Sequence, residues 1–339
     1  MSESAAATGP EPILDLAFGF WASQALLSAV ELGVFRALAG GPLEFGELQA
    51  ATGIRRGARD LFDVLVASDM LDRDAGGRYS LTELTSLYLD ETKPDTYLGG
   101  LLEMANRRLY PFWGHLTDAL RTGKPQNETR HGGDFFPTLY ADPDRLRGFL
   151  RSMSGRSMGA IRALVDAFPW KDYRTVTDVG CAQGTLLAHL VKRHPHLAAT
   201  GFDLPAVQAP FEEHAARLGV PLSFAGGDFL AEPLPGSEVL IFGHILHDWD
   251  LDRKRELIAK AYAALPPGGA IIVYEALIDD ERRSHAYGML MSLNMAVETE
   301  GGFDFTGADC AGWLRDAGFV DTSVQTLTGH EGMVVGFKR

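Results

Sequence analysis

Residues 175–193 read "TVTDVGCAQGTLLAHLVKR": a short apolar segment, a turn between two glycines, and a helical segment. Gly180 and Gly184 bracket the turn. Glycine lets a backbone approach a ligand closely, and the start of a helix offers free N–H groups. The stretch therefore predicts a strand, a tight ligand-binding turn and a helix.

The same alternation continues along the chain. Short apolar segments separated by helical stretches read "LAATGFDL", "LSFAGGDF", "EVLIFGH" and "GAIIVYEAL". Repeated strand–helix units predict an open, doubly wound and mostly parallel α/β sheet with helices on both faces. We expect this domain over residues 166–339. Ligands of such sheets bind at the carboxyl ends of the strands.

Carboxylates stand at three of these strand ends. Asp178 ends the first strand, Asp203 and Leu204 end the second in "GFDLP", and Asp228 and Phe229 end the third in "GGDFL". Asp203 can accept hydrogen bonds from both ribose hydroxyls, or it can cap a helix. Asp228 can accept a hydrogen bond from an exocyclic amine, and the Phe229 ring can cover an adenine or lie in the core.

Together, these strand ends indicate a site for adenosine. The turn lacks the third glycine of the dinucleotide fingerprint G-x-G-x-x-G. The sequence therefore favours S-adenosylmethionine over NAD as the cofactor.

Size and composition exclude several classes of protein. The chain has 339 residues, a net charge of −14 and a pI near 5.1, which argues against non-specific binding to nucleic acid or anionic membrane. The two cysteines suggest neither a metal site nor a disulfide framework. With no signal peptide and no run of about 18 apolar residues, we expect a cytoplasmic protein without a membrane partner.

The N-terminal half predicts a separate helical domain. Residues 1–12 are expected to be a disordered leader, and residues 13–95 a winged helix with a hairpin at Gly76-Gly77. Its first helix is apolar on more than one side, which fits either core packing or a dimer surface. The second helix of the module carries Asp as well as Arg, which favours a structural or dimerisation role over DNA binding. Residues 96–165 are expected to be helical linker and pocket segments.

From residue 13 onward the chain resembles the S-adenosylmethionine-dependent small-molecule methyltransferases of the plant caffeate and bacterial phenazine or anthracycline O-methyltransferase type. The matching stretches are "ELGVF", "DVGCAQG", "GFDLP", "GDFL", "HDWD", "ALPPGGAIIVYE" and "GGFDFTGADCAGWLRDAGF". The resemblance implies a winged-helix dimerisation domain, an intertwined homodimer and a Rossmann-like catalytic domain.

The resemblance also implies roles for residues at the fourth and fifth strand ends and in the later segment "GGFDFT". His247 in "HDWD" matches the general base, and Glu275 and Asp304 match the carboxylates that flank it. Asp304 replaces a more usual Glu. Asp248 would lie near the methionyl amine or cap the next helix, and Trp249 would pack beside the adenine or in the core.

Further pocket residues follow from the same matching. Ser157 in "FLRSMSGRS" would reach the cofactor carboxylate, and Met153 would touch the substrate. Met291 and Met295 match a second substrate-lining segment. Methionines at such spacing are more often core residues, so only the resemblance supports these assignments.

One position departs from the plant pattern. His244 stands where the plant enzymes carry an aromatic residue, and with His247 and Glu298 it makes a candidate divalent-metal triad. Arg107 and Arg108 could pair with a substrate carboxylate, or lie on a solvated or dimer face.

Two chemistries therefore compete. O-methylation of a hydroxyl by His247 is favoured. Metal-assisted C-methylation of the β-carbon of an α-keto acid is the alternative. A winged-helix regulator that binds DNA is a third hypothesis.

Overall fold

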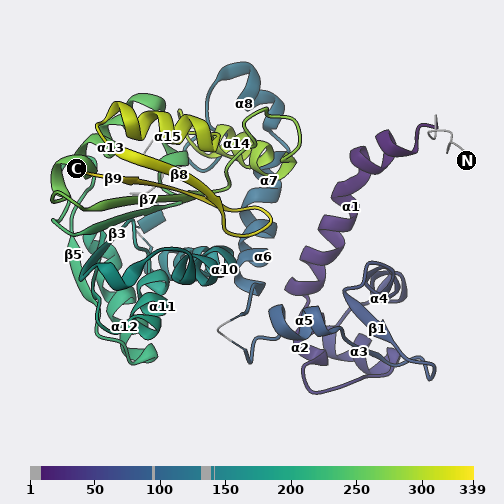
Figure 1. The fold of residues 1–339 in the computed structure, drawn as a ribbon. Helices are drawn as coiled ribbons and strands as arrows, with labels where there is room; N and C mark the ends of the chain where they lie inside the picture. The colour runs from purple at the N-terminus through teal and green to yellow at the C-terminus, as the bar shows by residue number, and fades with distance from the viewer. Residues whose placement is uncertain (1–8, 94–95, 131–138, 141) are drawn as a thin grey trace, which may run out of the picture. The chain divides into compact units, whose positions relative to one another are not determined.

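The computed structural model describes residues 9–93, 96–130, 139–140 and 142–339, which fall into two compact units (Figure 1). One unit runs up to Tyr110 and the other from Pro111 to Arg339. The boundary lies inside the segment expected to be a helical linker. Most of the expected leader lies outside the described residues, and the first helix already begins at Glu11.

The N-terminal unit combines helices with one hairpin. Its elements are α1 (Glu11–Glu31), α2 (Val34–Leu38), α3 (Phe45–Thr52), α4 (Ala58–Ala67), β1 (Leu71–Arg73), β2 (Tyr79–Leu81), α5 (Glu83–Tyr88), α6 (Gly99–Met104) and the π-helix η1 (Ala105–Leu109). Strands β1 and β2 pair antiparallel, and Gly77 takes a φ of +85° between them. The predicted wing hairpin is therefore confirmed.

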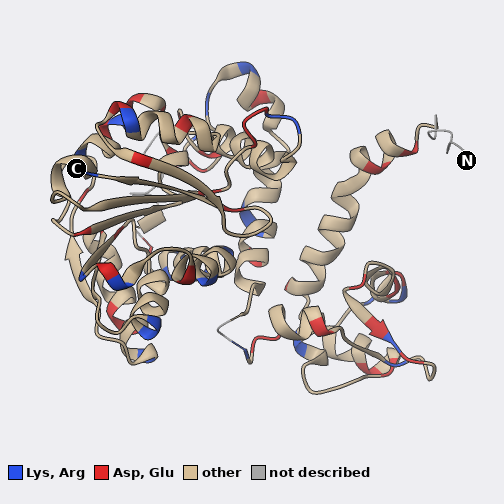
Figure 2. Cartoon of the chain, in the orientation of Figure 1, with Lys and Arg blue, Asp and Glu red and all other residues tan. Residues whose placement is uncertain are grey.

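The charged side chains of α4 interact with other residues of the N-terminal unit. The Arg59 guanidinium lies 4.1 Å from the centre of the Phe45 ring, and Arg73 pairs with Asp63 at 2.7 Å. The buried Tyr79 hydroxyl donates to Asp63 at 2.6 Å. Basic and acidic residues are interspersed over the unit (Figure 2). This helix is therefore poorly suited to bind phosphates.

Helix α1 exposes a large apolar surface within its own unit. The exposed fractions are 73% for Ile13, 86% for Leu16 and 62% for Trp21. By length and composition α1 could cross a membrane. The sequence has no run of about 18 apolar residues, and α1 meets a different criterion: its mean hydropathy is high although Asp15 and several Ser and Gln residues interrupt the apolar run. A surface of this kind needs a covering partner.

The larger unit contains a seven-stranded sheet with the order β5-β4-β3-β6-β7-β9-β8. Its strands are β3 (Thr175–Val179), β4 (Ala198–Asp203), β5 (Ser223–Gly226), β6 (Val239–Gly243), β7 (Ala270–Glu275), β8 (Val320–Thr326) and β9 (Gly332–Phe337). The first five are mutually parallel, whereas β9 runs antiparallel between β7 and β8. The mostly parallel sheet is confirmed, and the final hairpin is an addition that the sequence pattern did not predict.

Helices cover both faces of the sheet (Figure 1). The remaining helices that the structure describes are α7 (Tyr110–Trp113), α8 (Leu116–Thr122), α10 (Pro143–Ala167), α11 (Thr185–Arg193), α12 (Gln208–Leu218), α13 (Leu251–Ala264), α14 (Ala286–Glu298) and α15 (Gly307–Asp316), with 3-10 turns η2 (Trp170–Asp172), η3 (Pro205–Val207) and η4 (Leu246–Asp248). Successive residues of β6 point to opposite faces. Ile241 joins the core under α10, α11 and α12, and Leu240 joins the core under α13 and α15.

Candidate active site

The glycine turn after β3 is shaped for close approach. Gly180 and Gly184 have φ values of +73° and +78°. A β-carbon on Gly180 would lie 2.2 Å from Cδ1 of Ile245, and one on Gly184 would lie 2.4 Å from the Phe211 ring. Any larger residue at either position would therefore distort the turn that leads into α11.

Carboxylates line the ends of the neighbouring strands. Asp203 accepts hydrogen bonds from the backbone N–H groups of Ala182 at 2.9 Å and Leu204 at 2.8 Å, which ties it to the glycine turn. Burial raises its pKa to about 6 and that of Asp178 to about 8. Asp228 accepts from the backbone N–H of Leu230 at 2.8 Å. The three acids meet at the edge where the sequence predicted the cofactor.

Two aromatic rings stand beside these acids. Phe229 and Trp249 pack edge to face, with ring centres 6.1 Å apart. Lys260 fixes the loop below them by donating to the backbone carbonyls of Phe229 and Leu230 at 2.7 and 2.8 Å. Such a pair offers an apolar wall for a planar base.

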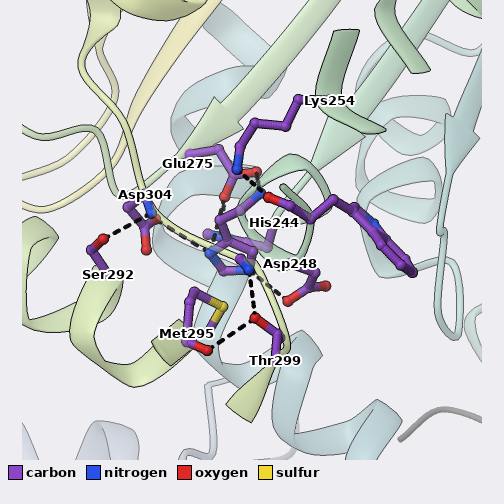
Figure 3. A network of polar contacts seen from close by, with 11 residues as sticks. His244, Asp248, Lys254, Glu275, Ser292, Met295, Thr299 and Asp304 are labelled. Carbon is purple, nitrogen blue, oxygen red and sulfur yellow. Dashed lines mark hydrogen bonds and ion pairs between the residues drawn. The ribbon is translucent and has the colours of Figure 1, made fainter. Parts of the chain in front are cut away.

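His247 lies on η4, directly after β6, among three acids. Its Nδ1 is 3.3 Å from Asp304 Oδ1 and 3.5 Å from Glu275 Oε2, and its Nε2 is 3.5 Å from Asp248 Oδ1. Its backbone N–H donates to Glu275 Oε1 at 3.3 Å. Figure 3 shows Asp304 and Asp248 on opposite sides of this cluster, with Glu275 above them in the view. The structure thus brings together the three residues that the resemblance implied.

Burial and charge act in opposite directions on this cluster. Burial lowers the pKa of His247, but Glu275, Asp304 and Asp248 outweigh it and raise the pKa to about 10. Burial also raises the pKa of Asp248 to about 6 and shifts the pKa of Glu275 upward, although His247 opposes both shifts. The imidazolium form is therefore strongly stabilised, as a general base requires after it has taken a proton.

Asp248 is not the helix cap that the sequence offered as one alternative. Helix α13 is capped by Asp250, whose carboxylate accepts from the backbone N–H of Arg253 at 2.8 Å. The physical reason is register, because η4 extends through Asp248 and delays the start of α13 by two residues. Asp248 is left free to face the His247 ring.

His244 occupies a strained position next to this cluster. Its φ is +54°, and its ring packs edge to face on Tyr274 at 5.1 Å. Nδ1 lies 3.5 Å from Glu275 Oε2, and Nε2 lies 3.8 Å from Glu331 Oε2. Burial lowers the pKa of His244 to about 3, so the ring is neutral at physiological pH.

A neutral, buried imidazole beside a second one could hold a metal. In the part of the chain that the structure describes, ligand atoms of His244, His247 and Glu275 lie within 4.8 Å of one another. The expected third ligand, Glu298, is not in this group. It lies buried at the end of α14, where its backbone carbonyl accepts from Asn127 Nδ2 at 2.7 Å.

The other expected pocket residues have varied surroundings. Ser157 is buried on α10 and hydrogen-bonds the Tyr274 hydroxyl, while Met153 on the same helix is half-buried. On α14, Met295 is buried and Met291 half-buried.

The two arginines belong to the N-terminal unit. Arg107 lies on η1 and pairs with Glu31 at 3.7 Å, and Arg108 follows it there. Arg107 therefore pairs with a carboxylate of its own unit.

Sequence reasoning missed three charged residues that act on this cluster: Glu331 lies beside His244, and Arg156 and Lys254 act on Glu275. Nε and Nη2 of Arg156 are buried, and neither has a hydrogen-bond partner among the described residues. Burial raises the pKa values of Glu275 and Tyr287, and the charge of Arg156 opposes both shifts. Arg156 stands one turn after Met153, which is the one signal that could have pointed to it.

Comparisons with known proteins agree with this geometry. A model of the O-methyltransferase domain matches residues 113–320, and a model of the O-methyltransferase dimerisation domain matches residues 14–91. The chain belongs to the O-methyltransferase family. It is 45% identical over 333 residues to the tetracenomycin polyketide synthesis 8-O-methyl transferase TcmO of Streptomyces glaucescens, covering 97% of each chain. It is 35% identical to the 3-hydroxy-5-methyl-1-naphthoate 3-O-methyltransferase of Streptomyces sahachiroi, covering 97% and 95%.

Solved structures extend the likeness to the whole fold. The human N-acetylserotonin methyltransferase in complex with S-adenosylmethionine superposes with a TM-score of 0.89 at 30% identity, covering 100% of this chain and 99% of that one. The mitomycin 7-O-methyltransferase MmcR superposes with a TM-score of 0.80 at 25% identity, covering 97% of each. This member of the O-methyltransferase family is therefore an S-adenosylmethionine-dependent methyltransferase with the expected Rossmann-like fold.

The residues at the strand ends fit that cofactor. The Gly180–Gly184 turn stays tight because neither glycine has a side chain, Asp203 and Asp228 supply acceptors, and the Phe229–Trp249 pair supplies an apolar wall. The dimerisation match includes α1, so it supports a homodimer that would cover the apolar surface of this helix.

Proposed function

We propose that this protein methylates an aromatic hydroxyl, with His247 as the general base. The observation that carries the proposal is the orientation of the His247 ring. Nδ1 faces the two carboxylates of Asp304 and Glu275, so the neutral ring donates from Nδ1 and keeps its lone pair on Nε2.

The protein's own groups account for the proton transfer. When bound, S-adenosylmethionine supplies a methyl group on a positively charged sulfur. His247 Nε2 takes the hydroxyl proton while the acceptor oxygen bonds to the methyl carbon and the carbon–sulfur electron pair stays on sulfur. Asp304 and Glu275 then stabilise the imidazolium. A positioned base of this kind contributes roughly 10²- to 10⁴-fold to the rate.

The acceptor we propose is a fused aromatic acid or phenol of secondary metabolism. Support comes from the names of the relatives, which act in tetracenomycin polyketide synthesis and on a hydroxynaphthoate. Arg156 adds a physical reason, because two buried guanidinium nitrogens, Nε and Nη2, have no hydrogen-bond partner among the described residues and favour an anionic ligand. A carboxylate or an acidic phenol on the acceptor would supply that anion.

The close group of His244, His247 and Glu275 keeps metal-assisted C-methylation of an α-keto acid as a second candidate. In that chemistry the two histidines and the acid would hold a divalent cation that stabilises an enolate. The names of the 45% and 35% identical relatives favour the hydroxyl instead.

We further propose a cytoplasmic homodimer that binds neither nucleic acid nor membrane. The mixed charges of α4 support the absence of a DNA role, because Asp63 already neutralises Arg73. Most of α1 matches a dimerisation domain, so its apolar surface would pack against a second copy of the chain and not against a membrane.

One experiment tests the acceptor atom. Purified protein is incubated with S-adenosylmethionine and either 3-hydroxy-1-naphthoate, a catechol or phenylpyruvate, with and without a chelator, and products are identified by mass spectrometry. O-methylated product in the presence of chelator supports the proposal. Chelator-sensitive C-methylation of the keto acid, with metal in the purified protein, would replace it with the second candidate.

A further inference from the structure

Lys254 on α13 is fully buried, with 0% of its surface exposed, and it is the only buried lysine in the described ranges. Lysine is almost never buried completely unless it is paired. No carboxylate lies within ion-pair distance of its Nζ among the described residues. Its placement therefore needs another explanation.

The partners of the Lys254 ammonium are a carbonyl and an aromatic face. Nζ donates to the backbone carbonyl of Trp249 and lies 3.4 Å from the centre of the Phe303 ring and 5.6 Å from that of Phe305. Both are favourable neutral contacts for a cation. Figure 3 shows Lys254 extending toward Glu275, on the side away from Met295 and Thr299.

These contacts reach the two segments that carry the catalytic pair. Trp249 is two residues after His247, and Phe303 and Phe305 flank Asp304 on either side. Asp304 is 1% exposed, and its backbone N–H donates a hydrogen bond to Ser292 Oγ at 3.1 Å. One side chain thus joins the loop of the base to the loop of its carboxylate.

We propose that Lys254 is a positioning residue that holds Asp304 against His247 Nδ1 during methyl transfer. The inference rests on the function proposed above. Lys254 touches neither reacting group, and it acts by fixing the distance between the two loops.

The charge of Lys254 supports this role. Burial lowers its pKa to about 8, while Glu275, Asp304 and Asp248 oppose the shift, so the side chain remains largely cationic at neutral pH. An apolar residue of similar volume would fill the same space without the free-energy cost of burying a charge. A cation is useful here because it offsets the three acids around His247.

Three variants test the proposal. Lys254→Met keeps the length of the side chain and removes the charge and the donor, and Lys254→Arg restores both. Lys338→Met is the matched control, because Lys338 also donates to backbone carbonyls (Tyr262 at 2.6 Å, Leu265 at 2.7 Å) and lies 4.7 Å from a ring centre, that of Tyr262. The assay is full-length protein with S-adenosylmethionine and 3-hydroxy-1-naphthoate.

In Lys254→Met we expect kcat to fall roughly 10- to 100-fold, because small misplacements of catalytic groups have effects of that size. Both KM values should stay within about threefold of the parent, since no substrate contact is lost. Lys254→Arg should recover most of kcat. Lys338→Met should lower the melting temperature and leave kcat unchanged.

Parental kcat in Lys254→Met would overturn the proposal, and so would a loss confined to the KM for the cofactor. If this variant fails to fold, Phe303→Leu removes the ring and leaves the lysine, and unchanged kcat there would overturn the proposal equally. His247→Asn in the same assay separates the two ideas, because activity in that variant contradicts the proposed base whatever the Lys254 variants do.

Discussion

Asp304 Oδ1 lies 3.3 Å from His247 Nδ1, on the opposite side of the imidazole from the nitrogen that would receive the substrate proton. A neutral ring held in this way has one tautomer, with hydrogen on Nδ1 and a lone pair on Nε2. The relationship thereby fixes both the direction of proton transfer and the group that stabilises the charge afterwards.

His247→Asn should abolish proton transfer and leave cofactor binding intact. We expect kcat to fall by roughly 10² to 10⁴, with a Kd for S-adenosylmethionine in calorimetry that is no weaker than that of the parent. His196→Asn is the control, because that ring contacts the Trp170 carbonyl at 3.1 Å and the His194 ring, far from the cluster around His247 in the sheet. Near-parental turnover of His247→Asn would remove the base assignment.

Cofactor binding should release a proton. Burial lowers the pKa of His247, but its acids raise it to about 10, so the ring is protonated at pH 8 in the cofactor-free protein. A positive charge placed nearby lowers that pKa. Calorimetry in two buffers of different ionisation enthalpy should show more proton release with S-adenosylmethionine than with S-adenosylhomocysteine, which lacks the sulfonium. The difference should vanish in His247→Asn, and equal release by both ligands in the parent would refute the coupling.

Asp178→Asn should stabilise the protein in alkaline solution. Burial, with help from Asp203, raises the pKa of Asp178 from 3.8 to about 8. Since the folded pKa is the higher one, its stabilising effect is complete below 3.8 and is lost as the pH rises through about 8. Asparagine mimics the protonated acid, so the melting temperature should exceed that of the parent by roughly 2–4 °C per kcal/mol regained at pH 9, and by nothing at pH 4. Asp172→Asn, at an exposed site, is the control.

Arg156→Gln should discriminate between charged and neutral acceptors. A hydrogen bond to a charged group contributes about 1.5–3 kcal/mol, so kcat/KM for 3-hydroxy-1-naphthoate should fall at least roughly tenfold. Its methyl ester should be affected much less. Arg151→Gln, exposed on the same helix, should change neither. A rise in KM for S-adenosylmethionine instead would assign Arg156 to the cofactor.

The sequence was informative wherever function depends on the end of a strand. Asp178, Asp203 and Asp228 could be placed at one edge because parallel strands bring their carboxyl ends together. His247, Glu275 and Asp304 came from the family resemblance, and the structure brings them within hydrogen-bonding or ion-pair range.

Other features depend on contacts between distant segments. In the sequence, Lys254 is one of several charged residues on an amphipathic helix. Only the folded structure shows that its ammonium group packs on the Phe303 ring. Glu275 and Glu298 are both acids near a histidine pair, but pattern alone could not tell which one lies within reach of His244. Sequence pattern alone did not identify α1 as long and apolar enough to cross a membrane. The pattern sought was an uninterrupted apolar run, whereas α1 has a high hydropathy only when this is averaged over the helix.

The position of β9 affects how the protein is made. Glu275 ends β7 and pairs in register with Gly332, the first residue of β9. During synthesis β7 therefore leaves the ribosome well before the strand that will lie beside it. A nascent chain stalled short of β9 would carry the carboxylate that faces His247 on an unpaired sheet edge, so this edge is completed only among the last steps of translation.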